Sequence, residues 1–184
     1  MAPTKHWPHR PGSNPVTRFS LHLPRHQARL VALAVHYHLA RPGSELDAET
    51  MAPYQHGLAE VPAALEPQLD TEAASLELNA LQVTLLGTAL SSVISELKMY
   101  SLFDTMARGS GRPRSTAPGF DDRLRSLFPQ VAADPSYASQ LAEEMTMLRR
   151  QLPSARARQL LEEERRAAQE AARRWRKRWR FWKR

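Results

Sequence analysis

A repeated stretch constrains the fold of this chain more than any other feature of its sequence. Residues 19–35 align with residues 74–90 at a constant offset of 55 positions. The identical pairs are Ser20 with Ser75, Leu21 with Leu76, Leu23 with Leu78, Gln27 with Gln82, Leu30 with Leu85 and Ala34 with Ala89. Similarity at a fixed offset indicates a duplicated structural unit. The alternative is a chance similarity between two amphipathic segments.

In each copy, the hydrophobic residues first recur at every second position and then at every third or fourth position. The Ser-Leu-x-Leu alternation at residues 20–23 and 75–78 predicts a short strand that buries its two leucines. A helix follows, with Pro24 opening the first copy and Asn79 as the cap of the second. The apolar residues with helical spacing are Leu30, Val31, Ala34, Val35 and Leu39, then Leu81, Leu85, Leu86, Ala89, Val93, Ile94 and Leu97.

So short a strand is not stable alone. We therefore expect the two strands to pair across a pseudo-twofold axis, with both helices packed on one face of the pair. The predicted fold class is mainly α: a helical body built from a duplicated strand-and-helix unit, followed by C-terminal helices that include a long basic one. The predicted segments are a basic Pro- and His-rich tail (1–17), the duplicated helical domain (18–107, with copies near 19–41 and 74–106), a flexible linker (108–119), a helical segment (120–153) and the long C-terminal helix (154–184).

Local signals place the shorter elements. Between the copies, a helical face is predicted at Leu46, Met51, Tyr54 and Leu58, and residues 65–69, bracketed by prolines, are predicted to form a loop. Further helices are predicted to begin at Asp121 and Asp122, at Asp134 and Pro135, and at Ser154.

Charge is unevenly distributed along the chain. Residues 1–41 hold six basic side chains and no acidic one, residues 42–172 have a net charge of −7, and residues 173–184 have a net charge of +8, which together give the total of +7. The body is therefore acidic and both ends are basic. This pattern predicts that the ends bind polyanions, while the acidic body contacts protein partners.

The last dozen residues contain eight basic and four aromatic side chains. Trp175, Trp179 and Trp182 continue a helical face that begins at Leu161. Basic side chains bind nucleic-acid phosphates, and tryptophan rings stack on exposed bases. The predicted nucleic-acid-binding residues here are Arg173, Arg174, Trp175, Arg176, Lys177, Arg178, Trp179, Arg180, Trp182, Lys183 and Arg184.

The predicted linker adds Arg112 and Arg114 to this set. Gly111-Arg112-Pro113 resembles the centre of an AT-hook, a short motif that binds the minor groove of A·T-rich DNA. The resemblance covers three residues; Arg114 follows them, but Ser110 stands where the motif has a basic residue. The alternative is that this tripeptide is only a hinge.

Two other ligands suit the same C-terminal residues. On an anionic membrane surface, the tryptophans would lie at the headgroup level and the basic side chains would reach the lipid phosphates. In a large assembly, the same tail would dock in an acidic protein groove, since Trp and Arg are frequent hot-spot residues.

No pattern of catalytic residues is found in the sequence. The chain has no cysteine, and it has no Gly-rich phosphate loop, nucleophile elbow or zinc-protease motif. His22 and His26 have the i, i+4 spacing of a helical metal site, but His22 falls in the predicted strand and Pro24 lies between them. His36 and His38 are two positions apart and do not converge on a helix. We predict a non-enzymatic accessory or adaptor subunit that binds DNA or RNA, without a metal or cofactor.

The sequence also predicts a cytoplasmic location. The longest unbroken apolar run, residues 30–35, is far shorter than the ~20 residues that cross a membrane. The N-terminal prolines are unlike a signal peptide, and they oppose the amphipathic helix of a transit peptide, which is the alternative for this acid-free, Arg-containing segment.

Overall fold

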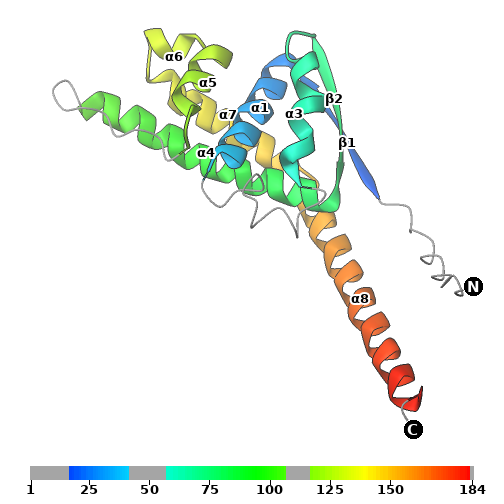
Figure 1. Cartoon of the computed structure of the whole chain (residues 1–184). Helices are drawn as coiled ribbons and strands as arrows, with labels where there is room; N and C mark the ends of the chain where they lie inside the picture. Colours follow the sequence, from blue (N-terminus) through cyan, green and yellow to red (C-terminus); the bar gives the residue numbers. More distant parts are fainter. Residues whose placement is uncertain (1–16, 42–56, 107–116, 183–184) are drawn as a thin grey trace, which may run out of the picture.

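The computed structural model describes residues 17–41, 57–106 and 117–182, without the side chains of residues 103–106, 177, 178 and 180–182. It shows a mainly helical fold with a small two-stranded antiparallel sheet (Figure 1). The elements are β1 (Arg18–Pro24), α1 (Arg25–Ala40), η1 (Leu58–Glu60), α3 (Val61–Leu65), η2 (Glu66–Gln68), β2 (Ala73–Asn79), α4 (Ala80–Met106), α5 (Phe120–Leu127), α6 (Gln130–Ala133), α7 (Tyr137–Gln151) and α8 (Ser154–Trp182).

The predicted pairing of the two strands is confirmed. β1 and β2 form an antiparallel ribbon whose register runs from Arg18 opposite Asn79 to Pro24 opposite Ala73. Leu21 lies opposite Leu76, and these two residues are equivalent in the alignment of the copies. Each copy therefore meets the other at the same position, as a pseudo-twofold axis through the ribbon requires.

The two faces of the ribbon differ in chemistry because successive side chains of a strand point to opposite sides. The inner face packs on the core, and its residues are Phe19, Leu21, Leu23, Ala74, Leu76 and Leu78. The outer face is polar and exposed, and its residues include Arg18, Ser20, His22, Ser75 and Glu77. A shift of one residue in register would move the leucines into water, so the hydrophobic pattern fixes the pairing.

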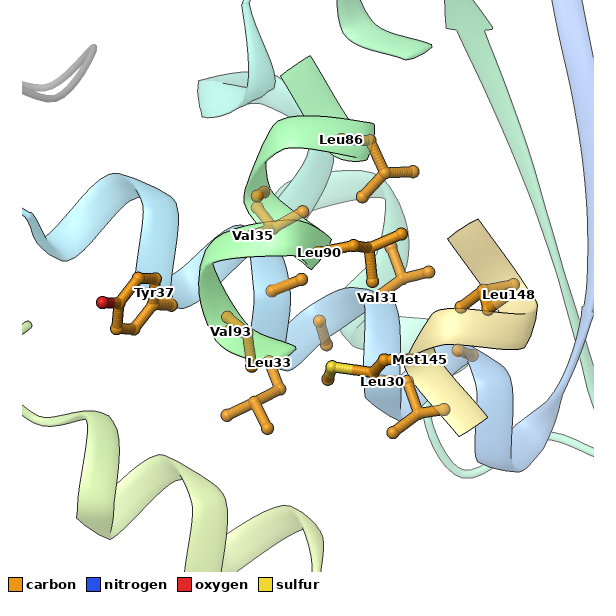
Figure 2. Close-up of a cluster of buried hydrophobic side chains, with 14 of the residues drawn as sticks. Leu30, Val31, Leu33, Val35, Tyr37, Leu86, Leu90, Val93, Met145 and Leu148 are labelled. Atoms are coloured by element: carbon orange, nitrogen blue, oxygen red, sulfur yellow. The ribbon is translucent and has the colours of Figure 1, made fainter. Parts of the chain in front are cut away.

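The core lies around α4, which contacts α1, α7 and α8. Figure 2 shows side chains from α1, α4 and α7 meeting in one cluster. The buried side chains labelled there are Leu30, Val31, Leu33, Val35 and Tyr37 of α1, Leu86, Leu90 and Val93 of α4, and Met145 and Leu148 of α7.

The N-terminus of α4 is closed by a reciprocal cap. The amide N–H of Gln82 donates to Asn79 Oδ1, and the amide N–H of Asn79 donates to Gln82 Oε1, both at 2.9 Å. This satisfies two backbone donors that a helix start leaves without intrahelical partners. The predicted role of Asn79 as a cap is confirmed. In the first copy, Pro24 lies one residue before the helix and forms no side-chain cap.

The prediction of a loop at residues 65–69 is wrong. Leu65 ends α3, and η2 follows directly. Pro62 and Pro67 both lie at the first or second position of their short helices, where a missing N–H removes no intrahelical bond. These prolines therefore start helical turns rather than bracketing a loop.

Other local predictions had mixed outcomes. The helix predicted at Asp134 begins later, at Tyr137, after Asp134 Oδ1 accepts hydrogen bonds from the N–H and Oγ of Ser136. The helices predicted from residues 121 and 154 are present as α5 and α8.

Of the helical face predicted between the copies, Leu58 is buried in η1, whereas residues 46, 51 and 54 lie outside the described residues. The division of the chain into segments stays a prediction.

By length and composition alone, α4 could cross a membrane over Ala80–Leu102, where its mean hydropathy is 1.4. Such a window needs a high mean hydropathy and not an unbroken apolar run. The length of the longest run, residues 30–35, therefore did not reveal it. Half of the window is buried inside the protein. Because another side of α4 carries a line of hydroxyl groups beside Arg149, we interpret α4 as the core helix of this fold.

Removing a central core side chain tests this packing. We expect Leu90→Ala to lower the free energy of unfolding by about 2–5 kcal/mol, because Leu90 is fully buried and its truncation leaves a cavity. Leu102→Ala, at a site 55% exposed on the same helix, should cost under ~0.5 kcal/mol. Urea unfolding followed by far-UV circular dichroism measures both. Equal losses would contradict the assignment of the core.

The side chain of His36 should make stability depend on pH. Burial, then the positive charge of Arg123, lowers the pKa of His36, while Glu66 opposes this shift. The unfolded chain then binds the proton more readily, so the free energy of unfolding should fall as pH drops below about 6.5. We expect the His36→Gln variant to show a smaller fall in the free energy of unfolding. The His22→Gln variant, changed at an exposed position, should show the same fall as the wild type. Thermal melts between pH 5 and 8 make the comparison, and identical pH profiles for the wild type and His36→Gln would contradict it.

Candidate nucleic-acid interface

The C-terminal helix α8 leaves the body after its first two turns. Ala157 is buried, and Leu160 and Leu161 pack partly buried against the core. Every side chain from residue 162 to residue 176 is exposed. From residue 162 to its end, α8 therefore projects by roughly 30 Å at 1.5 Å per residue, and Figure 1 shows it as a single helix extending away from the rest of the fold.

Interactions within the helix support this projecting segment. Glu162 pairs with Arg166 at 3.6 Å, and Glu170 pairs with Arg174 at 3.8 Å, each with the acid four residues before the base. Pairs in this orientation stabilise a helix by about 0.2–0.5 kcal/mol each. The absence of Gly and Pro from residues 154–182 helps as well.

Trp175 and Trp179 form a stacked pair on the exposed part of α8. Their ring centroids are 6.0 Å apart, and the ring planes meet at 26°. The two residues are 63% and 52% exposed, respectively. Large apolar rings in water are unfavourable unless a partner covers them, so the pair marks a contact surface.

The arginines beside the tryptophans are also exposed. Arg173, Arg174 and Arg176 lie on α8, and no acidic residue follows Glu170 in the sequence. Among these three, Arg174 pairs with Glu170, whereas Arg173 and Arg176 pair with no carboxylate in the described part of the chain. The tip of α8 therefore combines accessible cations with accessible aromatic rings.

The structure places only some of the predicted binding residues. The backbone of Lys177, Arg178, Arg180 and Trp182 continues α8, but their side chains lie outside the described residues. Arg112, Arg114, Lys183 and Arg184 lie outside them entirely. The AT-hook resemblance therefore stays a prediction.

The outer face of the ribbon is a second polar surface, which was not among the sites predicted from the sequence. Across the two strands, Ser20 lies opposite Glu77 and donates a hydrogen bond to its carboxylate. His22 lies opposite Ser75, and Arg18 lies at the end of the face. The alternation that predicted the buried leucines also implies these outward positions, so the signal was present in the sequence.

Two arginines of the basic N-terminal region are already engaged. Arg25 and Arg29 donate hydrogen bonds to the same oxygen of Asp70, at 2.9 and 3.0 Å. These bonds lower the pKa of the Asp70 carboxyl group, which is fully exposed. Charge counting assigns both arginines to a free basic end, whereas the fold brings an acid from the body to them.

Among the paired histidines of the first copy, His26 has a structural role. His26 bonds to Glu144 and lies edge-on to the ring of Phe128 at 5.4 Å, which ties α1 to the following helices. In residues 17–41, 57–106 and 117–182, no three His, Asp or Glu side chains gather as a metal site would require.

Comparison with known proteins adds no family or homologue. The chain matches no protein-family model, no curated protein and no solved structure.

Proposed function

We propose that this protein is a non-enzymatic accessory subunit that binds nucleic acid through the exposed end of α8. The observation that carries this proposal is the stacked, exposed pair Trp175 and Trp179 in a segment whose charged residues are all basic. Aromatic side chains that stack on bases contribute about 1–3 kcal/mol per base. The neighbouring arginines neutralise phosphates, which gives affinity without much sequence preference.

The ribbon supports DNA as the nucleic acid. The major groove of B-form DNA admits a two-stranded ribbon, whereas the major groove of an RNA duplex is too deep and narrow for side chains to read. The outer face offers groups that bind base edges: the guanidinium of Arg18, the hydroxyls of Ser20 and Ser75, and the carboxylate of Glu77, which can accept from a cytosine amino group. Its inner face is occupied by the core, so only this polar side is available to a ligand.

Proteins are the second class of partner that we propose. The net charge of −7 over residues 42–172 makes the body acidic overall and therefore suited to basic protein surfaces. The projecting helix would then hold nucleic acid away from the surface that contacts another subunit.

The tryptophan pair provides a direct test. We expect Trp175→Ala with Trp179→Ala to weaken binding of a single-stranded oligonucleotide at least tenfold, because two stacking contacts are lost. Deletion of residues 173–184 should weaken it further and reduce the salt dependence. Fluorescence anisotropy against salt measures both effects, with Met147→Ala, an exposed apolar site on α7, as the control.

Other outcomes would identify the other ligands. Unchanged oligonucleotide affinity in the deletion variant would refute the proposal. Co-sedimentation with anionic but not neutral vesicles would favour a membrane surface, and specific capture of an acidic protein by the α8 segment would favour docking within an assembly.

A second test concerns the ribbon. We expect Arg18→Ala with Ser75→Ala to weaken binding to duplex DNA by about 1–3 kcal/mol per lost base contact, and to leave single-stranded binding unchanged. Arg125→Ala with Ser139→Ala, at exposed positions on α5 and α7, is the matched control. Competition assays with duplex and single-stranded DNA separate the two surfaces. An equal effect on both ligands would exclude the ribbon as a duplex-binding element.

A further inference from the structure

A polar groove lies where α4, α7 and α8 meet. Its volume is about 670 Å³. The residues that line it are Thr84, Gly87, Thr88, Ser91, Ser92 and Ser95 of α4, Arg149 of α7, and Ser154 and Arg158 of α8. This lining contains six hydroxyl groups, two guanidinium groups and no carboxylate.

Four of the five hydroxyl groups that α4 contributes to this lining already use their hydrogens. Thr84, Thr88, Ser91 and Ser95 each donate to the backbone carbonyl four residues earlier, at 2.8–3.3 Å. Their oxygen lone pairs are therefore what they offer to a ligand. A molecule that fills this groove needs N–H or O–H donors along its length.

The two arginines give the groove a positive charge. Arg149 donates to Ser91 Oγ at 2.8 Å, and Arg158 donates to the carbonyl of Ser154 at 3.2 Å. A guanidinium has five N–H donors, so most of the donors of each arginine remain for an anion. Arg41 approaches the same side of α4 and donates to Ser92 Oγ at 3.4 Å.

The groove is continuous with a line of arginines on α8. At 3.6 residues per turn, Arg165 and Arg176 fall within about 20° of Arg158 around the helix. Both are exposed, and neither pairs with a carboxylate in the described part of the chain. The line from Arg158 to Arg176 is roughly 27 Å long at 1.5 Å per residue, and it ends beside Trp179.

We infer that this groove binds the phosphodiester backbone of the nucleic acid whose bases stack on the tip of α8. The inference rests on the proposed function and extends its binding surface to the body of the protein. A nucleic acid supplies both partners that the lining requires: phosphates for the guanidinium groups, and base amino groups or, in RNA, 2′-hydroxyl groups as donors to the hydroxyl oxygens. An acidic helix supplies carboxylates, but its backbone N–H groups are already bonded. A compact apolar ligand would leave the polar lining unpaired.

The test compares two double variants with the same change in charge. Arg149→Gln with Arg158→Gln removes the cations of the groove. Arg150→Gln with Arg156→Gln removes exposed arginines next to them in sequence, which bond instead to Met147 and Gln159. For a long oligonucleotide, we expect the groove variant to lose about tenfold in affinity and its log–log salt slope to fall by about 1.4–1.8, the value for two phosphate contacts. The control variant should change much less.

A chemical probe gives a second measurement that does not depend on these arginines. The chain has no cysteine, so Ser95→Cys places a unique thiol in the groove, and Ser139→Cys places one on an exposed part of α7 outside it. We expect bound oligonucleotide to slow maleimide labelling at position 95 and to leave labelling at position 139 unchanged. Circular dichroism melts confirm that each variant is folded.

The outcomes separate the two proposals. If the wild-type protein binds no oligonucleotide, both the proposed function and the groove are refuted. If it binds, but the two double variants behave alike and labelling at position 95 is not slowed, only the groove is refuted. Loss of affinity and slope confined to the groove variant, with protection at position 95, supports the groove as part of the interface.

Discussion

The pairing of β1 with β2 is the interaction on which the rest of the fold depends. Neither strand is long enough to be stable alone, so each copy of the repeat is completed by the other. The helices α1 and α4 begin immediately after the strands, at Arg25 and Ala80, and the ribbon therefore sets where both core helices start. α4 then supplies the surface on which α7 and α8 pack. An error in strand register would displace the start of both core helices as well as the buried leucines.

The projecting part of α8 begins where the hydrophobic residues that pack on the body end. Among the described side chains, α8 packs on the core through residues up to Leu161, and charged residues, alanines and Gln169 follow until Trp175. With no Gly or Pro and with acid–base pairs along its side, the helix continues without a packing partner. Its length thus carries the tryptophans away from the acidic residues of the body.

Sequence reasoning succeeded where the signal was local or repeated. The offset of 55 predicted the strand pairing, and the register centred on Leu21 and Leu76 confirms it. Asn79 and α8 were also predicted correctly, since caps and uninterrupted helical segments are encoded by neighbouring residues. Pro62 and Pro67 misled because a proline can begin a helical turn as readily as end one. The groove was not predictable, because Ser91, Arg149 and Arg158 become neighbours only when three helices pack.

Folding redistributes the charges that counting along the chain assigns to the ends and to the body. The acidic residues of the body are used partly to neutralise cations that are distant in sequence: Asp70 bonds to Arg25 and Arg29, and Glu66 bonds to Arg123. Asp70 is largely exposed, so its pairs add little stability, whereas Arg123 is partly buried in its pair with Glu66. All three pairs offset positive charge near α1. The cations without a carboxylate partner in the described residues include Arg149, Arg158, Arg165, Arg173 and Arg176. These five lie on α7 and α8, so they place accessible positive charge along the groove and along the part of α8 that leads out of it.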